Sequence, residues 1–203
     1  MKTILPLAMA LLGGLSAASA AEPGDWELKV GVHAVDPASD NGRLAGGTLE
    51  AGVDDAVGAT FVLEYRVRPH LGLEVLAALP FKHEVTLDGG KAATVRQLPP
   101  TVSAQWHFIP QGTVDPFVGL GLNYTRFFSI DETGPLDGTR VELGDSWGLA
   151  AHAGVAFALQ DRWSLTLDLR WIDIESEVKV NGVKVGTVDI DPLVYGAALG
   201  YRF

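Results

Sequence analysis

Cysteine is absent from this chain of 203 residues. Without thiols the protein has no disulfide framework, no thiolate nucleophile and no zinc–thiolate site. Positive charge is also scarce, because 15 Lys and Arg stand against 25 Asp and Glu, which gives a formal net charge of −10. A chain this acidic is not expected to bind nucleic acid or to adsorb directly to anionic lipid.

Long apolar runs are missing after residue 20, so the sequence predicts no transmembrane helix. The one apolar run stands at the start, where Lys2 precedes residues 4–15 and the small residues Ala18, Ser19 and Ala20 follow. This order is typical of a secretory signal peptide, and the short run disfavours a membrane anchor. We expect residues 1–20 to be a signal peptide and residues 21–203 to form one domain.

Apolar residues recur with period two in the rest of the chain. The stretch "WSLTLDLRW", from Trp163 to Trp171, has only Trp and Leu on one face and hydroxylic or charged residues on the other. No comparable stretch has a helical period. Eight segments alternate in this way: 26–34, 57–66, 71–79, 102–108, 118–124, 147–159, 163–171 and 195–203.

The connections between these segments alternate in length. Those after the second, fourth and sixth segments are short, "VRPH", "IPQGTVD" and "QDR", and the others are long. An even number of strands with short turns on one side and long loops on the other is typical of a barrel in the bacterial outer membrane. The sequence therefore predicts an all-β fold, an eight-stranded antiparallel transmembrane β-barrel with short periplasmic turns and long extracellular loops.

The apolar faces should then contact lipid. Trp163 and Trp171 would be about 20 Å apart along the membrane normal, close to the height of an outer-membrane apolar band. A soluble sandwich with the leucines in its core is the alternative, but it does not account for aromatics at so many strand ends. The aromatics expected at the lipid interfaces are Trp26, Tyr65, Trp106, Tyr124, Trp147, Trp163, Trp171, Tyr195, Tyr201 and Phe203.

The residues between the lipid-facing ones should point into the lumen. Near the outer end they include an apolar set, expected to form a pocket: Val35, Leu76, Ala78, Gly148, Ala150, Ile172 and Val194. Below it we expect a charged layer: Glu27, Lys29, Glu64, Arg66, Glu74, Asp168, Arg170 and Arg202. Four acids and four bases predict internal ion pairs, because an unpaired buried charge is costly.

Two questions about the lumen stay open at this point. The many inward glycines and alanines either leave space for a solute or only relieve crowding between strands. The charged layer either diverts a greasy solute sideways between strands into the bilayer, or only fills and stiffens the lumen.

Catalysis and metal binding find little support. Ser103 and His107 share a face but lie ~13 Å apart along a strand, too far for a nucleophile and its base. His33, His107 and His152 fit packed polar residues better than metal ligands. We expect no enzymatic activity, no metal and no cofactor. The acidic rim from Asp173 to Asp191 is either solvated or bridged by divalent ions to lipopolysaccharide phosphates.

Six ordered motifs resemble the OmpW/AlkL family of outer-membrane proteins: "LGLEVLAALPFKHEV", "QLPPTVSAQWHF", "PFVGLGLNYTRFF", "DSWGLAAHAGV", "WSLTLDLRWIDIE" and "GTVDIDPLVYGAALGYRF". The resemblance implies an eight-stranded barrel whose narrow, apolar lumen helps small hydrophobic molecules cross the outer membrane. It also implies an alternative, a structural or surface-interaction barrel of the kind that bacteriocins use as a receptor. The first long loop, "PASDNGRLAGGTLEAGVDD", matches least well.

The last long loop contains "VKVNGVKV", centred on Asn181 and Gly182. Asn-Gly between alternating residues predicts a two-residue type I′ turn that pairs Val180 with Val183. That register disagrees by one residue with the outward faces of the two flanking membrane strands. We therefore expect a twisted hairpin above the membrane with a β-bulge near Gly186 or Val188.

The chain ends in "YGAALGYRF", with Tyr195, Leu199, Tyr201 and the terminal Phe203 on one face. This pattern resembles the signal read by the outer-membrane assembly machinery, although the same residues could simply face lipid. Deleting Phe203 should lower the amount of folded protein in the outer membrane far more than its small contact area would. Normal membrane levels of the truncated protein, measured against a Leu199→Ala control, would refute a recognition role.

Overall fold

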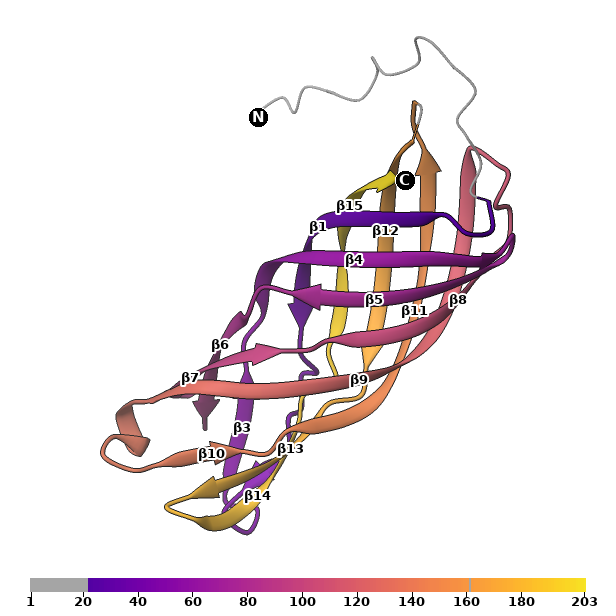
Figure 1. The fold of residues 1–203 in the computed structure, drawn as a ribbon. Helices are drawn as coiled ribbons and strands as arrows, with labels where there is room; N and C mark the ends of the chain where they lie inside the picture. Colours follow the sequence, from indigo (N-terminus) through magenta and orange to yellow (C-terminus); the bar gives the residue numbers. More distant parts are fainter. Residues whose placement is uncertain (1–21, 161) are drawn as a thin grey trace, which may run out of the picture.

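Eight antiparallel strands close into a barrel (Figure 1). The computed structural model describes residues 22–160 and 162–203, so the expected signal peptide lies outside the described residues. Closure comes from the pairing of β9 with β11. The barrel strands are β1 (Trp26–Asp36), β4 (Ala56–Arg68), β5 (Leu71–Ala78), β8 (Thr101–His107), β9 (Val114–Glu132), β11 (Ser146–Ala158), β12 (Trp163–Ile172) and β15 (Leu193–Arg202). The predicted fold class is confirmed.

Helices contribute almost nothing to this fold. In the described part of the chain none is long and apolar enough to cross a membrane.

The short turns set the registers that place each side chain. Phe108 N–H donates to Pro116 O and Leu159 N–H donates to Trp163 O, as the alternation predicts. Alternation alone would also allow Tyr65 to lie opposite Leu71, because both residues face outward, but Tyr65 pairs with Leu73. The ladder begins closer to the turn, at Arg68 and Leu71, and contains a bulge between Arg66 and Arg68. The difference of two residues leaves every side chain on its expected face.

The outer wall of the barrel is apolar and ringed by aromatics. One ring of aromatics lies at the end of the barrel where Trp26 and Phe203 exchange backbone hydrogen bonds. There the ring centroids of Trp26 and Tyr65 are 4.7 Å apart, and those of Trp163 and Tyr201 are 5.0 Å apart. At the other interface Tyr124 lies 4.8 Å from Trp147. The tryptophans are exposed, as are Tyr195, Tyr201 and Phe203, while Tyr65 and Tyr124 are half-buried.

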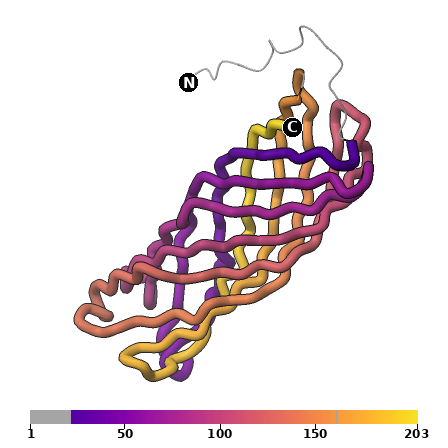
Figure 2. The backbone as a smooth tube through the Cα atoms, in the orientation of Figure 1, coloured from indigo at the N-terminus to yellow at the C-terminus, as the bar shows by residue number. Residues whose placement is uncertain are grey.

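Above the membrane the strands continue into a second region, here called the extracellular extension. The tube view shows the chain passing from the barrel into it without a break (Figure 2). The sequence predicts loops for these residues, except for the Asn-Gly hairpin. The extension consists of β2 (Arg43–Leu44), β3 (Leu49–Val53), β6 (Phe81–Leu87), β7 (Gly90–Leu98), the 3₁₀ helix η1 (Gly134–Leu136), β10 (Val141–Leu143), β13 (Glu175–Val180) and β14 (Val183–Asp189).

The Asn-Gly hairpin forms as predicted. Val180 pairs with Val183, and both turn residues have positive φ, 51° at Asn181 and 80° at Gly182. The ladder then shifts: Lys179 pairs with Lys184 but Val178 pairs with Gly186, which leaves Val185 as the extra residue. This bulge lies beside Gly186, so its predicted position is confirmed. It brings the hairpin into phase with the barrel pair Trp171 and Leu193.

Replacing Gly182 by Val should loosen the hairpin, because a β-branched residue is strained at the positive φ of this position. We expect a local cost of about 1–3 kcal/mol, so that amides of residues 178–185 exchange about tenfold faster or more with solvent deuterium. The exposed Val183→Thr substitution in the same hairpin is the control and should leave exchange unchanged. Equal exchange in the two variants would contradict the assigned turn.

Candidate functional site

The barrel lumen is filled by a buried network of charged side chains. At one pole Arg170 donates from Nη1 to Oε1 of Glu74 at 2.6 Å and from Nε to Oδ2 of Asp168 at 2.5 Å. His33 bridges the other oxygen of Asp168, at 2.8 Å, to the hydroxyl of Thr60, at 2.6 Å. All these side chains are buried, and the desolvation cost of each charge is offset because a partner lies within hydrogen-bond distance.

The other pole of the network is centred on Glu64. Its carboxylate accepts from Lys29 Nζ at 2.7 Å, from His107 Nε2 at 3.0 Å and lies 3.2 Å from Arg66 Nη2. His107 also contacts Asp115 through Nδ1 at 2.7 Å. Seven of the eight charges of the expected layer lie within these clusters or beside them, because Glu27 lies 3.9 Å from Lys29 and bonds to Ser164. The eighth, Arg202, is half-buried and lines a small space with Glu27 and Arg66.

Inward glycines make room for the large side chains of this network. A Cβ at Gly119 would collide with the ring of His152, and one at Gly196 with the ring of His33. A Cβ at Gly154 would collide with Phe117, which is 2 % exposed. Each of these glycines therefore accommodates a large side chain from a neighbouring strand, so relief of crowding is the alternative that applies at these positions.

Two members of the lumen were missed from the sequence. Asp115 and Phe117 lie before the segment 118–124 in which alternation was recognised. Extending the inward set Gly119, Gly121, Asn123 two steps backward reaches both residues, so the signal was present. The three inward histidines were seen as packed polar residues, but nothing in the sequence names their partners. Ser103 has no hydrogen bond to His107, whose nitrogens are held by Glu64, Gln105 and Asp115.

The apolar residues expected at the outer end of the lumen lie directly above the network. Val35, Leu76, Ile172 and Val194 line a space of only about 20 Å³, together with His33 and Arg170 of the network. Ala78 and Ala150 are also buried, and Gly148 is packed against the backbone of Asp173. At this level the lumen is a narrow throat rather than a pocket.

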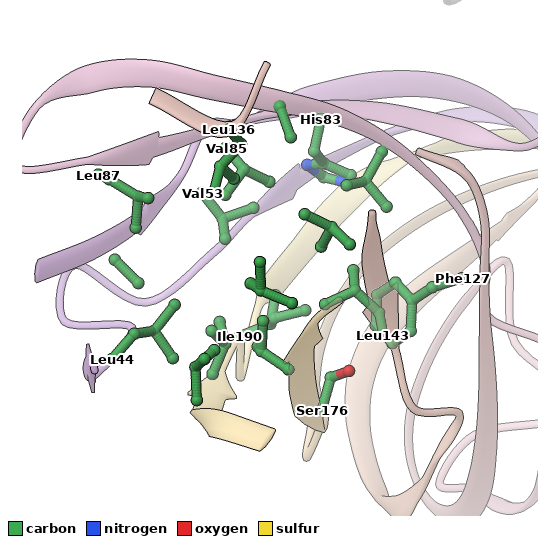
Figure 3. Close-up of a pocket in the computed structure, with 18 of the residues that line it drawn as sticks. Leu44, Val53, His83, Val85, Leu87, Phe127, Leu136, Leu143, Ser176 and Ile190 are labelled. Atoms are coloured by element: carbon green, nitrogen blue, oxygen red, sulfur yellow. The ribbon is translucent and has the colours of Figure 1, made fainter. Parts of the chain in front are cut away.

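The larger space lies higher, inside the extracellular extension. It is a cavity of about 260 Å³, here called the upper cavity, and Figure 3 shows that carbon atoms dominate its lining. Aliphatic residues and Phe127 make up most of the wall, and three polar residues stand among them, His83, Gln97 and Ser176. The strand residues at its wall include Leu44, Ala51, Val53, Val85, Leu87, Ala93, Val95, Phe127, Val141, Leu143, Val178, Val180, Val185 and Val188.

The upper cavity was not predicted from the sequence. The upper cavity needs four loops of the chain to fold as strands, and only one of those loops was expected to do so. A signal for the others existed: "FKHEVTL" sends His83, Val85 and Leu87 to the cavity, with polar residues between them. In β7, Ala93, Val95 and Gln97 do the same, again with period two.

Known proteins resemble this chain along nearly all of its described length. The sequence profile of the OmpW family matches residues 22–203. Outer membrane protein W of Salmonella typhi is 36 % identical over the whole of both chains, and that of Vibrio cholerae is 33 % identical over 96 % of this chain and 97 % of its own. The crystal structure of OprG from Pseudomonas aeruginosa superposes with a TM-score of 0.83, at 32 % identity over 91 % of this chain and 98 % of OprG.

The family match, the relatives that align over the whole chain and the β-barrel fold all indicate the same family. The chain is a protein of the outer membrane, and it belongs to the OmpW family.

Proposed function

We propose that this barrel takes small apolar molecules from the medium into the outer membrane. The upper cavity carries the proposal, because it is a preformed apolar space of about 260 Å³ on the outer side of the membrane. Its volume is slightly below the roughly 300–1,000 Å³ typical of small-molecule sites, which suits a small solute. Burial of apolar surface in such a space is favourable without any charged contact.

A straight path through the barrel is closed to such a solute. The buried ion pair of Arg170 on β12 with Glu74 on β5 joins opposite parts of the wall, and Lys29 and Glu64 form a second buried pair between the neighbouring strands β1 and β4. An apolar molecule offers these groups no hydrogen bond. Breaking one buried pair and leaving its charges unpaired costs roughly 3–5 kcal/mol. The network therefore acts as a floor that a solute arriving from above does not cross.

A gap in the strand pairing of the barrel wall supports a sideways exit. Pairing of β5 with β8 ends at Leu76 and Thr101, and pairing of β6 with β7 begins at Phe81 and Gln97. Within the described chain, no strand pair joins residues 77–80 to residues 98–100. Pro80, Pro99 and Pro100 lie in these segments and have no N–H to donate across them. The throat is bordered by Leu76, Phe81 and Pro99.

The gap also has a suitable height. Tyr124, one of the outer interface aromatics, donates its backbone N–H to Pro100 O at 3.0 Å. The gap in pairing therefore lies at the height where the ring of aromatic residues meets the apolar band of the barrel. A solute that passes from the upper cavity through the throat would leave between β5 and β8 into lipid, without crossing the charged floor.

Filling the upper cavity should abolish uptake. The double substitution Ala51→Phe and Ala93→Phe adds two rings at buried lining positions of β3 and β7. Cells that carry this variant should take up radiolabelled naphthalene no faster than cells without the protein. Ala104→Phe, on the lipid-facing side of β8, is the matched control and should keep wild-type uptake. Folding is checked by heat-dependent migration in detergent gels.

Equal uptake by cells with and without the wild-type protein would contradict the proposal. The chain would then remain a structural or surface-interaction barrel, with the extracellular extension as its contact surface. Full uptake by the filled variant would instead show that the route does not use the upper cavity.

A reversible cross-link tests the sideways exit. Ala78 and Pro99 are buried positions two residues beyond the last β5–β8 pair, and the chain has no cysteine of its own. A variant with Ala78→Cys and Pro99→Cys should transport naphthalene when reduced and lose transport when oxidised. The pair Ala153→Cys and Leu169→Cys, on the lipid-facing side of a wall that is already hydrogen-bonded, is the control. Transport that survives complete oxidation at 78 and 99 would exclude this exit.

A further inference from the structure

Among the described residues, three polar side chains line the upper cavity, and one of them, Gln97, has a buried hydrogen-bonding atom without a partner. The hydroxyl of Ser176 donates to Gly144 O at 2.8 Å. His83 contacts Asp54 O through Nδ1 at 2.7 Å and Gln97 Nε2 through Nε2 at 2.9 Å. In the part of the chain that the structure describes, Oε1 of Gln97 has no hydrogen-bond partner, although the residue is only 1 % exposed.

The orientation of the Gln97 amide follows from its neighbours. A backbone carbonyl cannot donate, so Nδ1 of His83 carries the proton that bonds to Asp54 O. Burial lowers the pKa of His83 below its usual value, so the ring is neutral and Nε2 is an acceptor. The amide NH₂ of Gln97 must therefore face His83, and its oxygen must point away from the ring.

Gln97 also has a particular place in the path. It lines both the upper cavity and the throat below it, opposite Phe81 in the β6–β7 pair. A buried carbonyl oxygen without a donor is costly, and buried polar groups in proteins are normally hydrogen-bonded. A ligand that supplies a donor at this junction would remove that cost while its apolar body stays among the aliphatic residues above.

Resting on the proposed uptake function, we infer that the upper cavity selects neutral apolar molecules that carry one hydrogen-bond donor, such as phenols and long-chain alcohols. The donor binds Oε1 of Gln97 at the entrance to the throat. A plain hydrocarbon gains only the apolar burial. A carboxylate is rejected, because it brings a negative charge to a carbonyl oxygen and no cation stands among the described lining residues of the upper cavity. Arg170 in the throat below is already paired with Asp168 and Glu74.

A matched pair of ligands tests this selectivity. Binding of 1-naphthol and of naphthalene is measured on the full barrel in lipid nanodiscs, with empty nanodiscs subtracted to remove partition into lipid. Wild-type protein should bind 1-naphthol roughly 3- to 10-fold more tightly than naphthalene, the effect of one hydrogen bond. Gln97→Leu, which removes the acceptor, should lower the ratio to about one, mainly by weakening 1-naphthol binding.

Two further variants keep the test decisive. Gln97→Met, which keeps an unbranched side chain of similar length, should behave as Gln97→Leu does, and it replaces that variant if Leu impairs folding. Gln111→Leu, the same replacement at an exposed position in the short turn between β8 and β9, lies outside the cavity and should keep the wild-type ratio.

The possible failures are distinguishable. Equal affinity of the wild-type protein for the two ligands, or an equal loss of both in Gln97→Leu, would overturn the inference while naphthalene binding still supported the proposed function. Binding of neither ligand above empty nanodiscs would overturn both.

Discussion

The backbone of a protein in lipid must satisfy its own hydrogen bonds, and the rest of this structure depends on that constraint. Eight strands meet it by closing on themselves through β9 and β11. A barrel of eight strands is only wide enough for its inward side chains. The interior can therefore be packed like a protein core, and here the packing consists of ion pairs around Glu64 and Arg170. In the described part of the chain, the cavity of about 260 Å³ lies where the strands have left the membrane.

Packing in the lumen works by size complementarity between neighbouring strands. Histidine and phenylalanine rings from one strand occupy the sites that glycine leaves on the next, as His152 does over Gly119 and Phe117 over Gly154. These rings also lie close to charged groups, since Lys29 Nζ lies 5.8 Å from the centre of the Phe117 ring. Glycine therefore has an electrostatic role in this barrel, because it allows the side chains that connect the charged clusters to cross the lumen.

Sequence alone was sufficient for the membrane part of the fold. Period-two alternation identifies which side chain faces lipid, and that pattern is local, so a register error of two residues beside Tyr65 does no harm. The hairpin bulge beside Gly186 could also be predicted, because a two-residue turn and the barrel faces impose incompatible registers on one short ladder.

The partners of individual side chains could not be predicted from the sequence. Arg170 contacts Glu74, 96 positions away in the chain, and His33 contacts Asp168, 135 positions away. Alternation says that such residues point inward but not how far each reaches across the lumen. The upper cavity was missed for a related reason. Its wall combines short strands that follow four different membrane segments, and residues such as Ala93 and Val185 reveal their common environment only after the barrel has closed.

This composite wall has a consequence for biogenesis. The first contribution, around Leu44 and Ala51, follows β1, and the last, around Val188, directly precedes β15. The wall of the upper cavity is therefore complete only when segments from near both ends of the chain have come together. A chain still in transit through the periplasm offers no finished apolar cavity. Assembly of the extracellular extension and formation of this cavity are one event.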